Sequence, residues 1–242
     1  MYFSTRDDRD NAQRALAPRF DVAAIEVSDD DWARRSQENL SPVTVGAITV
    51  FPAVASVPRS PSPLVPQSPS PESLAPVSIV IAPSMGFGTG HHATTRLCLE
   101  ALQTVDVRGR TVLDVGTGSG ILSIAAARLG AARVRGIDSD ADAIQSAREN
   151  LARNPDAMHI TLDVADLTRS APGPADVVTA NLTGALLVRS APVLAAAVRP
   201  GGLLIVSGFL AHERDEVRTA FPGATVVWER EDEGWLALVL KQ

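Results

Sequence analysis

The chain of 242 residues contains a single cysteine and a single lysine, and these two scarcities limit the chemistry that it can perform. With Cys98 as the one cysteine, an intrachain disulfide and a cysteine-based metal cluster are excluded. The neighbours Leu97 and Leu99 indicate that Cys98 is a small apolar group in the core. Because Lys241 is the only lysine, the chain offers almost no amine that could act as a catalytic lysine.

Long hydrophobic runs are also missing. Apolar stretches such as 201–206 are far shorter than the roughly 20 residues that a membrane-spanning helix requires. The charged segment MYFSTRDDRD is not typical of a signal peptide. A formal net charge of −6 argues against direct contact with nucleic-acid phosphates and is compatible with a basic protein partner. We therefore expect a monomeric, cytoplasmic protein that binds neither membrane nor nucleic acid.

The clearest structural signal is a strand, a turn, a helix and a second strand in the middle of the chain. Thr111–Val115 is β-branched and apolar, residues 116–120 form a glycine-rich turn, and Ile121–Leu129 is rich in alanine. A second strand, Arg133–Ile137, leads directly to Asp138. This order predicts half of a doubly wound α/β unit with an acidic residue at the tip of its second strand.

The spacing of the glycines distinguishes between two classes of nucleoside cofactor. Glycines allow a ligand to approach the backbone, the start of the following helix attracts an anion, and Asp138 can accept hydrogen bonds from ribose hydroxyls. A dinucleotide-binding turn requires a glycine at position 121, which is Ile121 here. The pattern Gly116, Gly118, Gly120 favours S-adenosylmethionine, which has no pyrophosphate. An ordinary strand-to-helix turn without a ligand is the alternative.

The rest of the chain predicts further strands that alternate with helices. Strands are expected at 160–164, 176–180 and 203–207, helices at 140–152, 185–198 and 213–221, and a hairpin from 224–230 and 235–240. The fold class is therefore a Rossmann-like α/β fold whose seven-stranded, mostly parallel sheet ends in an antiparallel hairpin. Ligands of such sheets bind at the carboxyl ends of the strands, where Gly116, Asp138, Asp163 and Asn181 are expected to converge. Asp163 and Asp166 either lie near the adenine or are solvated.

The amino-terminal third has a different character. Residues 1–55 are expected to form a small α+β fragment with a strand at 20–27, a helix at 30–39 and another strand at 43–51. Residues 56–78 carry seven of the 17 prolines and predict a semi-extended linker, with a proline-recognition ligand as the alternative. Residues 79–242 form the α/β domain.

A glycine-broken loop at 83–93 precedes a helix that is expected at Thr94–Leu102. The hydroxyls of Thr94 and Thr95 either cap this helix or bind the carboxylate of a ligand. The adjacent pair His91 and His92 has no third ligand at a suitable spacing, so we predict no metal site.

Three motifs together resemble the class I S-adenosylmethionine-dependent methyltransferases, and in particular the family that methylates large-subunit ribosomal protein eleven. They are the loop Phe87–Thr95, the turn Asp114–Leu122 and the pair Asn181–Leu182. The loop is far more particular to this family than the glycine turn. The resemblance covers about residues 79–240. It implies cofactor contacts and a methyl-transfer pocket at these positions: Thr95, Gly116, Gly118, Asp138 and Asn181 for the cofactor, Phe87 and Leu182 for the pocket.

The resemblance also implies the reaction, in which methyl groups pass to an amine of the ribosomal protein, either a lysine side chain or the N-terminal amine. The family's substrate-recruiting domain is longer than residues 1–55, and Ala82, Ser84 and His91 depart from its usual residues. Another protein or a small molecule as acceptor, or a non-catalytic cofactor-binding module, therefore stays open. The sequence assigns no general base, although His92 and Asp163 are candidates. The related glutamine methyltransferases carry Asn-Pro-Pro-Tyr at the end of the fourth strand. Residues 181–184 read Asn-Leu-Thr-Gly and lack these prolines and the aromatic residue, so planar amide acceptors are disfavoured.

Overall fold

The computed structural model describes residues 41–53, 75–82, 90–167 and 172–242. All of them belong to one compact unit, Leu40–Gln242, and the other unit, Met1–Asn39, lies outside the described residues. The elements expected at 20–27 and 30–39, most of the proline-rich segment and Phe87 therefore lie outside them as well. In the described part of the chain, none of the helices has the length and apolarity needed to span a bilayer.

A seven-stranded sheet forms the centre of the molecule, with the strand order β6-β5-β4-β7-β8-β10-β9. Its strands are β4 (Thr111–Val115), β5 (Arg133–Asp138), β6 (Ile160–Val164), β7 (Ala175–Asn181), β8 (Val198–Leu210), β9 (Thr225–Asp232) and β10 (Trp235–Lys241). The first five strands in this order run parallel, and β10 is antiparallel to both β8 and β9. The predicted mostly parallel sheet with an antiparallel edge hairpin is confirmed.

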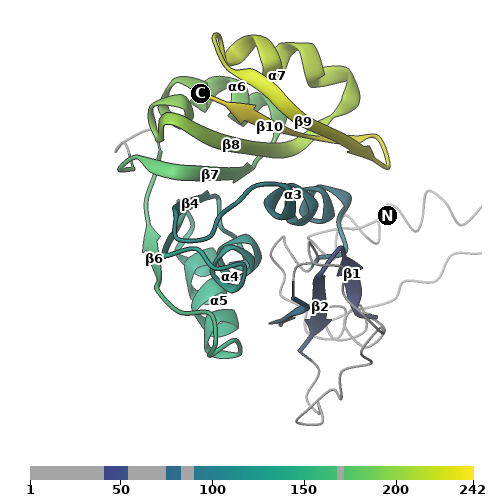
Figure 1. The fold of residues 1–242 in the computed structure, drawn as a ribbon, viewed down its shortest axis with the longest axis vertical. Helices are drawn as coiled ribbons and strands as arrows, with labels where there is room; N and C mark the ends of the chain where they lie inside the picture. The colour runs from purple at the N-terminus through teal and green to yellow at the C-terminus, as the bar shows by residue number, and fades with distance from the viewer. Residues whose placement is uncertain (1–40, 54–74, 83–89, 168–171) are drawn as a thin grey trace, which may run out of the picture. The chain divides into compact units, whose positions relative to one another are not determined.

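Helices cover both faces of this sheet (Figure 1). One face packs against α3 (Ala93–Thr104), α4 (Ile121–Arg128) and α5 (Ala141–Ala152), and the other against α6 (Gly184–Ala196) and α7 (Arg214–Ala220). Successive residues of a strand point to opposite faces, so Val112 belongs to the first core layer and Leu113 to the second. Cys98 is fully buried in the first layer, as predicted.

A separate three-stranded sheet consists of β1 (Val43–Val45), β2 (Ile48–Pro52) and β3 (Val77–Ile81). The single strand predicted over 43–51 is wrong, because Gly46 adopts a φ of +57° and turns the chain into a β1–β2 hairpin. Strand β3, whose first two residues lie inside the predicted linker 56–78, pairs with β2 in parallel. The three-part division of the chain stays a prediction.

Strand β8 is longer than the predicted 203–207, because it includes the segment Pro200-Gly201-Gly202, whose composition is typical of a turn. The pairing of β7 with β8 shifts register between Ala175 and Val177, opposite this segment. A side chain at Gly202 would lie only 2.7 Å from the Asp176 carbonyl oxygen, so glycine allows close approach. The turn signal therefore marks an irregularity inside a strand.

Asp176 connects β4, β7 and β8 at the amino-terminal edge of the sheet. Its carboxylate accepts hydrogen bonds from the Thr111 amide at 2.8 Å, the Thr111 hydroxyl at 2.7 Å and the Arg199 guanidinium at 2.8 Å. These bonds, led by the one from the Thr111 amide, lower the pKa of Asp176 from 3.8 to about 2.

Replacing this carboxylate should make the free energy of unfolding less dependent on pH in the acidic range. A lowered pKa means that the stabilisation is complete above pH 3.8 and is lost as the pH falls through about 2. We expect Asp176→Asn to be less stable than the wild type at pH 6, with a difference that shrinks toward pH 2. Urea unfolding across this pH range measures it, and a difference independent of pH would contradict the assignment.

Candidate functional site

Three of the predicted site residues lie side by side at the carboxyl edge of the sheet. Gly116 follows β4, while Asp138 and Asn181 end β5 and β7, the two neighbours of β4. The carboxylate of Asp138 accepts hydrogen bonds from the Gly118 amide at 3.0 Å and from the Asp140 amide at 3.1 Å. Asp138, at the end of β5, thus supports the conformation of the glycine turn, and its side chain lines the space next to the turn.

The turn between β4 and α4 depends on its glycines. Gly116, Gly118 and Gly120 have φ values of +69°, +53° and +81°, which other residues adopt at a cost. A side chain at Gly120 would meet the Cβ of Ala147 at 3.1 Å, and one at Gly116 would meet Cδ2 of Leu182 at 2.5 Å. The turn is therefore packed from one side by α5 and covered from the other by the segment after β7.

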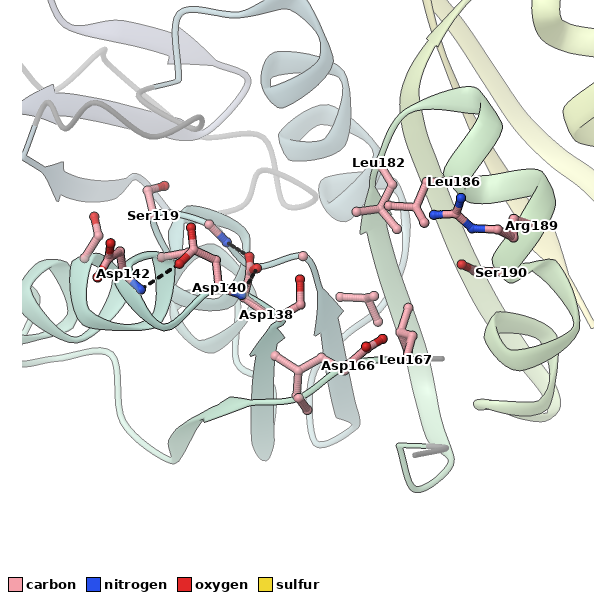
Figure 2. A pocket seen from close by; sticks show the side chains of 18 residues that line it. Ser119, Asp138, Asp140, Asp142, Asp166, Leu167, Leu182, Leu186, Arg189 and Ser190 are labelled. Carbon is pink, nitrogen blue, oxygen red and sulfur yellow. Dashed lines mark hydrogen bonds between the residues drawn. The ribbon is translucent and has the colours of Figure 1, made fainter. Parts of the chain in front are cut away.

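A cavity of about 840 Å³ opens beside the turn. Figure 2 shows Asp138, Asp140 and Asp142 on one side of it and Leu182, Leu186, Arg189 and Ser190 on the other, with Asp166 and Leu167 between them. Apart from Asp138, Leu182 and Asp166, these labelled residues were not indicated by the sequence, because helix faces and loop ends far apart in the chain contribute them. The mixed polar and apolar lining suits a nucleoside.

A second cavity of about 280 Å³ lies next to it. Its lining includes Thr95, Asn181 and Trp235, and it shares Gly116, Gly118, Leu182 and Leu186 with the larger cavity. The two cavities therefore meet at the glycine turn and at Leu182. This arrangement provides room for a ligand that extends from the larger space past the turn into the smaller one.

Asp114 supports the turn from below and has no predicted role. Its carboxylate is almost fully buried and accepts hydrogen bonds from Thr117 at 2.6 Å, Ser123 at 2.8 Å and Thr179 at 2.7 Å. Burial raises the pKa of Asp114, while the three hydroxyls oppose this shift. The hydroxyl network ties β4, β7, the turn and α4 together beneath the ligand space.

The start of α3 decides between the two alternatives for the threonines. His92 is the N-cap: its Nδ1 accepts from the Thr94 amide at 3.3 Å and lies 2.9 Å from the Thr94 hydroxyl. The Thr95 hydroxyl is buried and has no hydrogen-bond partner among the residues that the structure describes. An unpaired buried hydroxyl is costly, so its position beside the second cavity fits a ligand that supplies an acceptor.

Comparison with known proteins identifies the family. The model of the family described as "Ribosomal protein L11 methyltransferase (PrmA)" matches residues 5–242. The chain belongs to this family. It is 42% identical over 216 residues to the ribosomal protein L11 methyltransferase of Azotobacter vinelandii, covering 88% of this chain and 68% of that protein. With the Burkholderia pseudomallei protein of the same name it shares 39% over 232 residues, covering 93% and 69%.

A crystal structure supports the fold of the family. The ribosomal protein L11 methylase from Lactobacillus delbrueckii subsp. bulgaricus superposes with a TM-score of 0.70 at 25% identity, covering 83% of this chain and 98% of that chain. The predicted fold class and the resemblance to class I methyltransferases are confirmed. The cofactor of the family is S-adenosylmethionine. Thr95 carries a buried hydroxyl that can donate a hydrogen bond, Asp138 carries a carboxylate that accepts, and Gly116 leaves its backbone uncovered by a side chain.

Within this methyltransferase site, Trp235 is a residue that the sequence did not indicate. Its ring packs edge-on against His92, with 5.0 Å between the ring centroids, and it lines the smaller cavity. Arg96 holds the hairpin that carries Trp235, because its guanidinium bonds Asp232 at 2.6 Å and Glu233 at 3.0 Å. Trp235 and the start of α3 meet only through the fold, so local sequence contains no signal for their contact.

The structure places the two acidic residues at the end of β6 and just after it differently. Asp163 forms an ion pair with Arg135 at 2.8 Å and does not line either cavity, whereas Asp166 lines the larger one. Asp163 is therefore no cofactor or general-base candidate on this geometry. Gly118, Asn181 and Leu182 lie where they are predicted, and the cofactor and substrate roles of the individual residues stay predictions.

Replacing Thr95 by valine tests its role. Thr95→Val keeps the shape and removes an unpaired hydroxyl, so the ligand-free protein should be as stable as the wild type or more stable. Loss of a bond to a carboxylate should weaken binding of S-adenosylhomocysteine roughly 10- to 100-fold. Calorimetry and thermal melting measure both effects. Thr94→Val, which removes the hydroxyl 2.9 Å from His92 Nδ1 but keeps the capping amide, should instead lower the melting temperature, and unchanged affinity in Thr95→Val would contradict the role.

Proposed function

We propose that the protein transfers methyl groups from S-adenosylmethionine to amines of ribosomal protein L11, to lysine side chains or the N-terminal amine, in the cytoplasm. The observation that carries this proposal is the pair of cavities that meet at the glycine turn, in a chain that belongs to the L11 methyltransferase family. The larger cavity has the size and polar lining for the adenosine moiety. The smaller one has room for the methionine moiety and the end of an acceptor side chain.

The described residues divide the binding of the cofactor among three elements. Asp138 accepts hydrogen bonds from the ribose hydroxyls, and the backbone of Gly116 and Gly118 allows close approach of the sulfur-bearing chain. Thr95 donates its unpaired hydroxyl to the carboxylate of the methionine moiety. When bound, the cofactor supplies a methyl group on a positively charged sulfur. An amine lone pair can attack the carbon of this methyl group and displace the sulfur.

The acceptor amine must arrive without its proton, since a lysine with an ordinary pKa of about 10.4 has no free lone pair at neutral pH. Trp235 and Leu182 provide an apolar wall that favours the neutral amine, and the carboxamide oxygen of Asn181 orients an N–H of it. The bound cofactor would supply its methyl group to the lone pair of this amine, and the proton of the methylated amine would pass to water.

The structure supports a mechanism without a general base. His92 is the only ionisable side chain among the described residues that line the smaller cavity, and its Nδ1 already accepts from the Thr94 amide. The proton of its ring then resides on Nε2, so His92 has no free acceptor. Positioning and desolvation of the amine are the contributions of the protein.

Transfer of radiolabelled methyl groups to purified L11, followed by mass spectrometry of its peptides, tests the proposal. We expect label on amines of L11 with the wild type and little label with Asp138→Ala. Label on other ribosomal proteins but not on L11, in extracts of a strain lacking this gene, would favour a different acceptor. Binding of S-adenosylhomocysteine without any transfer would favour a non-catalytic module. Sedimentation checks the expected monomer.

A further inference from the structure

Two asparagines at the carboxyl end of α5, one inside the helix and one just after it, form hydrogen bonds with the backbone of other segments. Asn154 lies just after the helix, is 4% exposed, and pairs with Val80 of β3 through both atoms of its amide. Its Oδ1 accepts from the Val80 amide at 2.9 Å, and its Nδ2 donates to the Val80 carbonyl at 2.7 Å. The side chain therefore occupies the place that a neighbouring strand would take at the edge of the small sheet.

Asn150, one turn earlier, connects two segments at once. It is fully buried, and its Oδ1 accepts from the Ala82 amide at 2.8 Å, directly after β3. Its Nδ2 donates to the carbonyl of Ser119 at 2.9 Å, inside the glycine turn. One carboxamide thus holds the end of β3 and the turn of the cofactor site in a common position.

The surroundings of the bond between Asn150 and Ser119 are closely packed. Ser119 is 3% exposed, and Ala147 of the same helix packs against Gly120 so closely that a side chain there would lie 3.1 Å away. Water has little access to the Ser119 carbonyl on this side. Without the donor from Asn150, that carbonyl loses a buried hydrogen bond at the point where the turn must keep three positive φ angles.

We propose that Asn150 is a positioning residue that sets the conformation of the glycine turn and couples cofactor binding to strand β3. This inference rests on the proposed function, because it assigns the turn to cofactor binding. Asn150 does not touch the cavities and acts through Ser119 on the amides of the turn. By linkage, cofactor binding that stabilises the glycine turn also strengthens the hydrogen bond between the Ala82 amide and Asn150.

A matched pair of variants separates this role from general support of α5. Asn150→Asp keeps an acceptor for the Ala82 amide but, when ionised, offers no donor to the Ser119 carbonyl. Asn154→Asp removes the donors to Val80 and to the Asn150 carbonyl one helical turn away, without a contact to the glycine turn. Both place a carboxyl group at a buried position of the same region.

We expect Asn150→Asp to weaken binding of S-adenosylhomocysteine roughly 10- to 100-fold at pH 8.5, and Asn154→Asp to change it less than about threefold. Burial raises the pKa of the introduced carboxyl, so lowering the pH to 6 protonates it. The protonated group can donate to the Ser119 carbonyl, and the affinity of Asn150→Asp should recover while that of Asn154→Asp stays unchanged. A merely structural role would not produce this selective pH profile.

Wild-type affinity in Asn150→Asp, or equal losses in both variants, would overturn the inference. If the wild type itself fails to bind S-adenosylhomocysteine, the proposed function fails, and the inference fails with it. Hydrogen exchange of the wild type provides a test that needs no variant. Adding S-adenosylhomocysteine should slow exchange of the Ala82 amide and leave the Thr111 amide, held by Asp176 at the opposite edge, unchanged; an unaffected Ala82 amide would overturn the coupling.

Discussion

Replacing Gly116 by valine is expected to abolish measurable binding of S-adenosylhomocysteine, with a loss of affinity on the order of 100-fold or more. The new Cβ would lie 2.5 Å from Cδ2 of Leu182, where both cavities meet. Leu182 lines both cavities, so its displacement would change the space that the ligand needs, and the valine methyl groups would occupy the approach to the backbone. Isothermal titration calorimetry measures the loss.

Gly109 offers a matched control for the backbone effect. It has the same φ of +69°, but a side chain there would meet nothing within 4 Å. Gly109→Val should therefore share the cost of a left-handed residue, about 1–2 kcal/mol of folding free energy, and bind S-adenosylhomocysteine as the wild type does. If both variants keep their affinity, the ligand does not pass over the glycine turn.

Replacing Asp138 by alanine should cost about 1–3 kcal/mol of binding free energy for S-adenosylhomocysteine. Two losses add up, because the carboxylate binds the ribose hydroxyls and also accepts from the amides of Gly118 and Asp140. Asp138→Asn keeps one acceptor and should give an intermediate affinity. Calorimetry of the three proteins under one buffer condition measures the series.

Asp163 provides the charge-matched control for Asp138. It lies on the neighbouring strand β6 and loses the same charge on replacement by alanine, but its carboxylate pairs with Arg135 outside the cavities. We expect Asp163→Ala to leave the affinity unchanged and to cost less than about 1 kcal/mol of stability, as for other exposed ion pairs. Equal losses in Asp138→Ala and Asp163→Ala would indicate a general electrostatic effect instead of ribose binding.

The positions of Gly116, Asp138 and Asn181 could be predicted because they depend on one rule of topology. Parallel strands place their carboxyl ends at one edge of a sheet, so residues that follow three strands meet there even though the chain separates them. The rule does not predict which residues at the strand ends point toward the ligand. It therefore grouped Asp163 with the other three residues, although the side chain of Asp163 pairs with Arg135. Side-chain direction, which alternates along β6, decided that case.

Other features had no local signal. His92 instead of a threonine caps α3, which leaves the Thr95 hydroxyl unpaired beside the cavity. Both facts depend on the angle at which the chain enters the helix, which is set by tertiary packing. Two other glycines also had an effect that the sequence did not indicate: Gly46 reverses the chain, and Gly202 lies within β8, close to the Asp176 carbonyl.

The sequence by itself determined the sheet, the glycine turn and the class of cofactor, since these follow from short-range patterns of apolar residues, glycines and one acid at a strand end. Only the tertiary structure decided which further side chains complete the site: Trp235 from the edge hairpin and the carboxamide of Asn150. Each of them acts through a partner far away in the chain. Such contacts depend on how helices and strands pack, and the packing is a property of the whole fold.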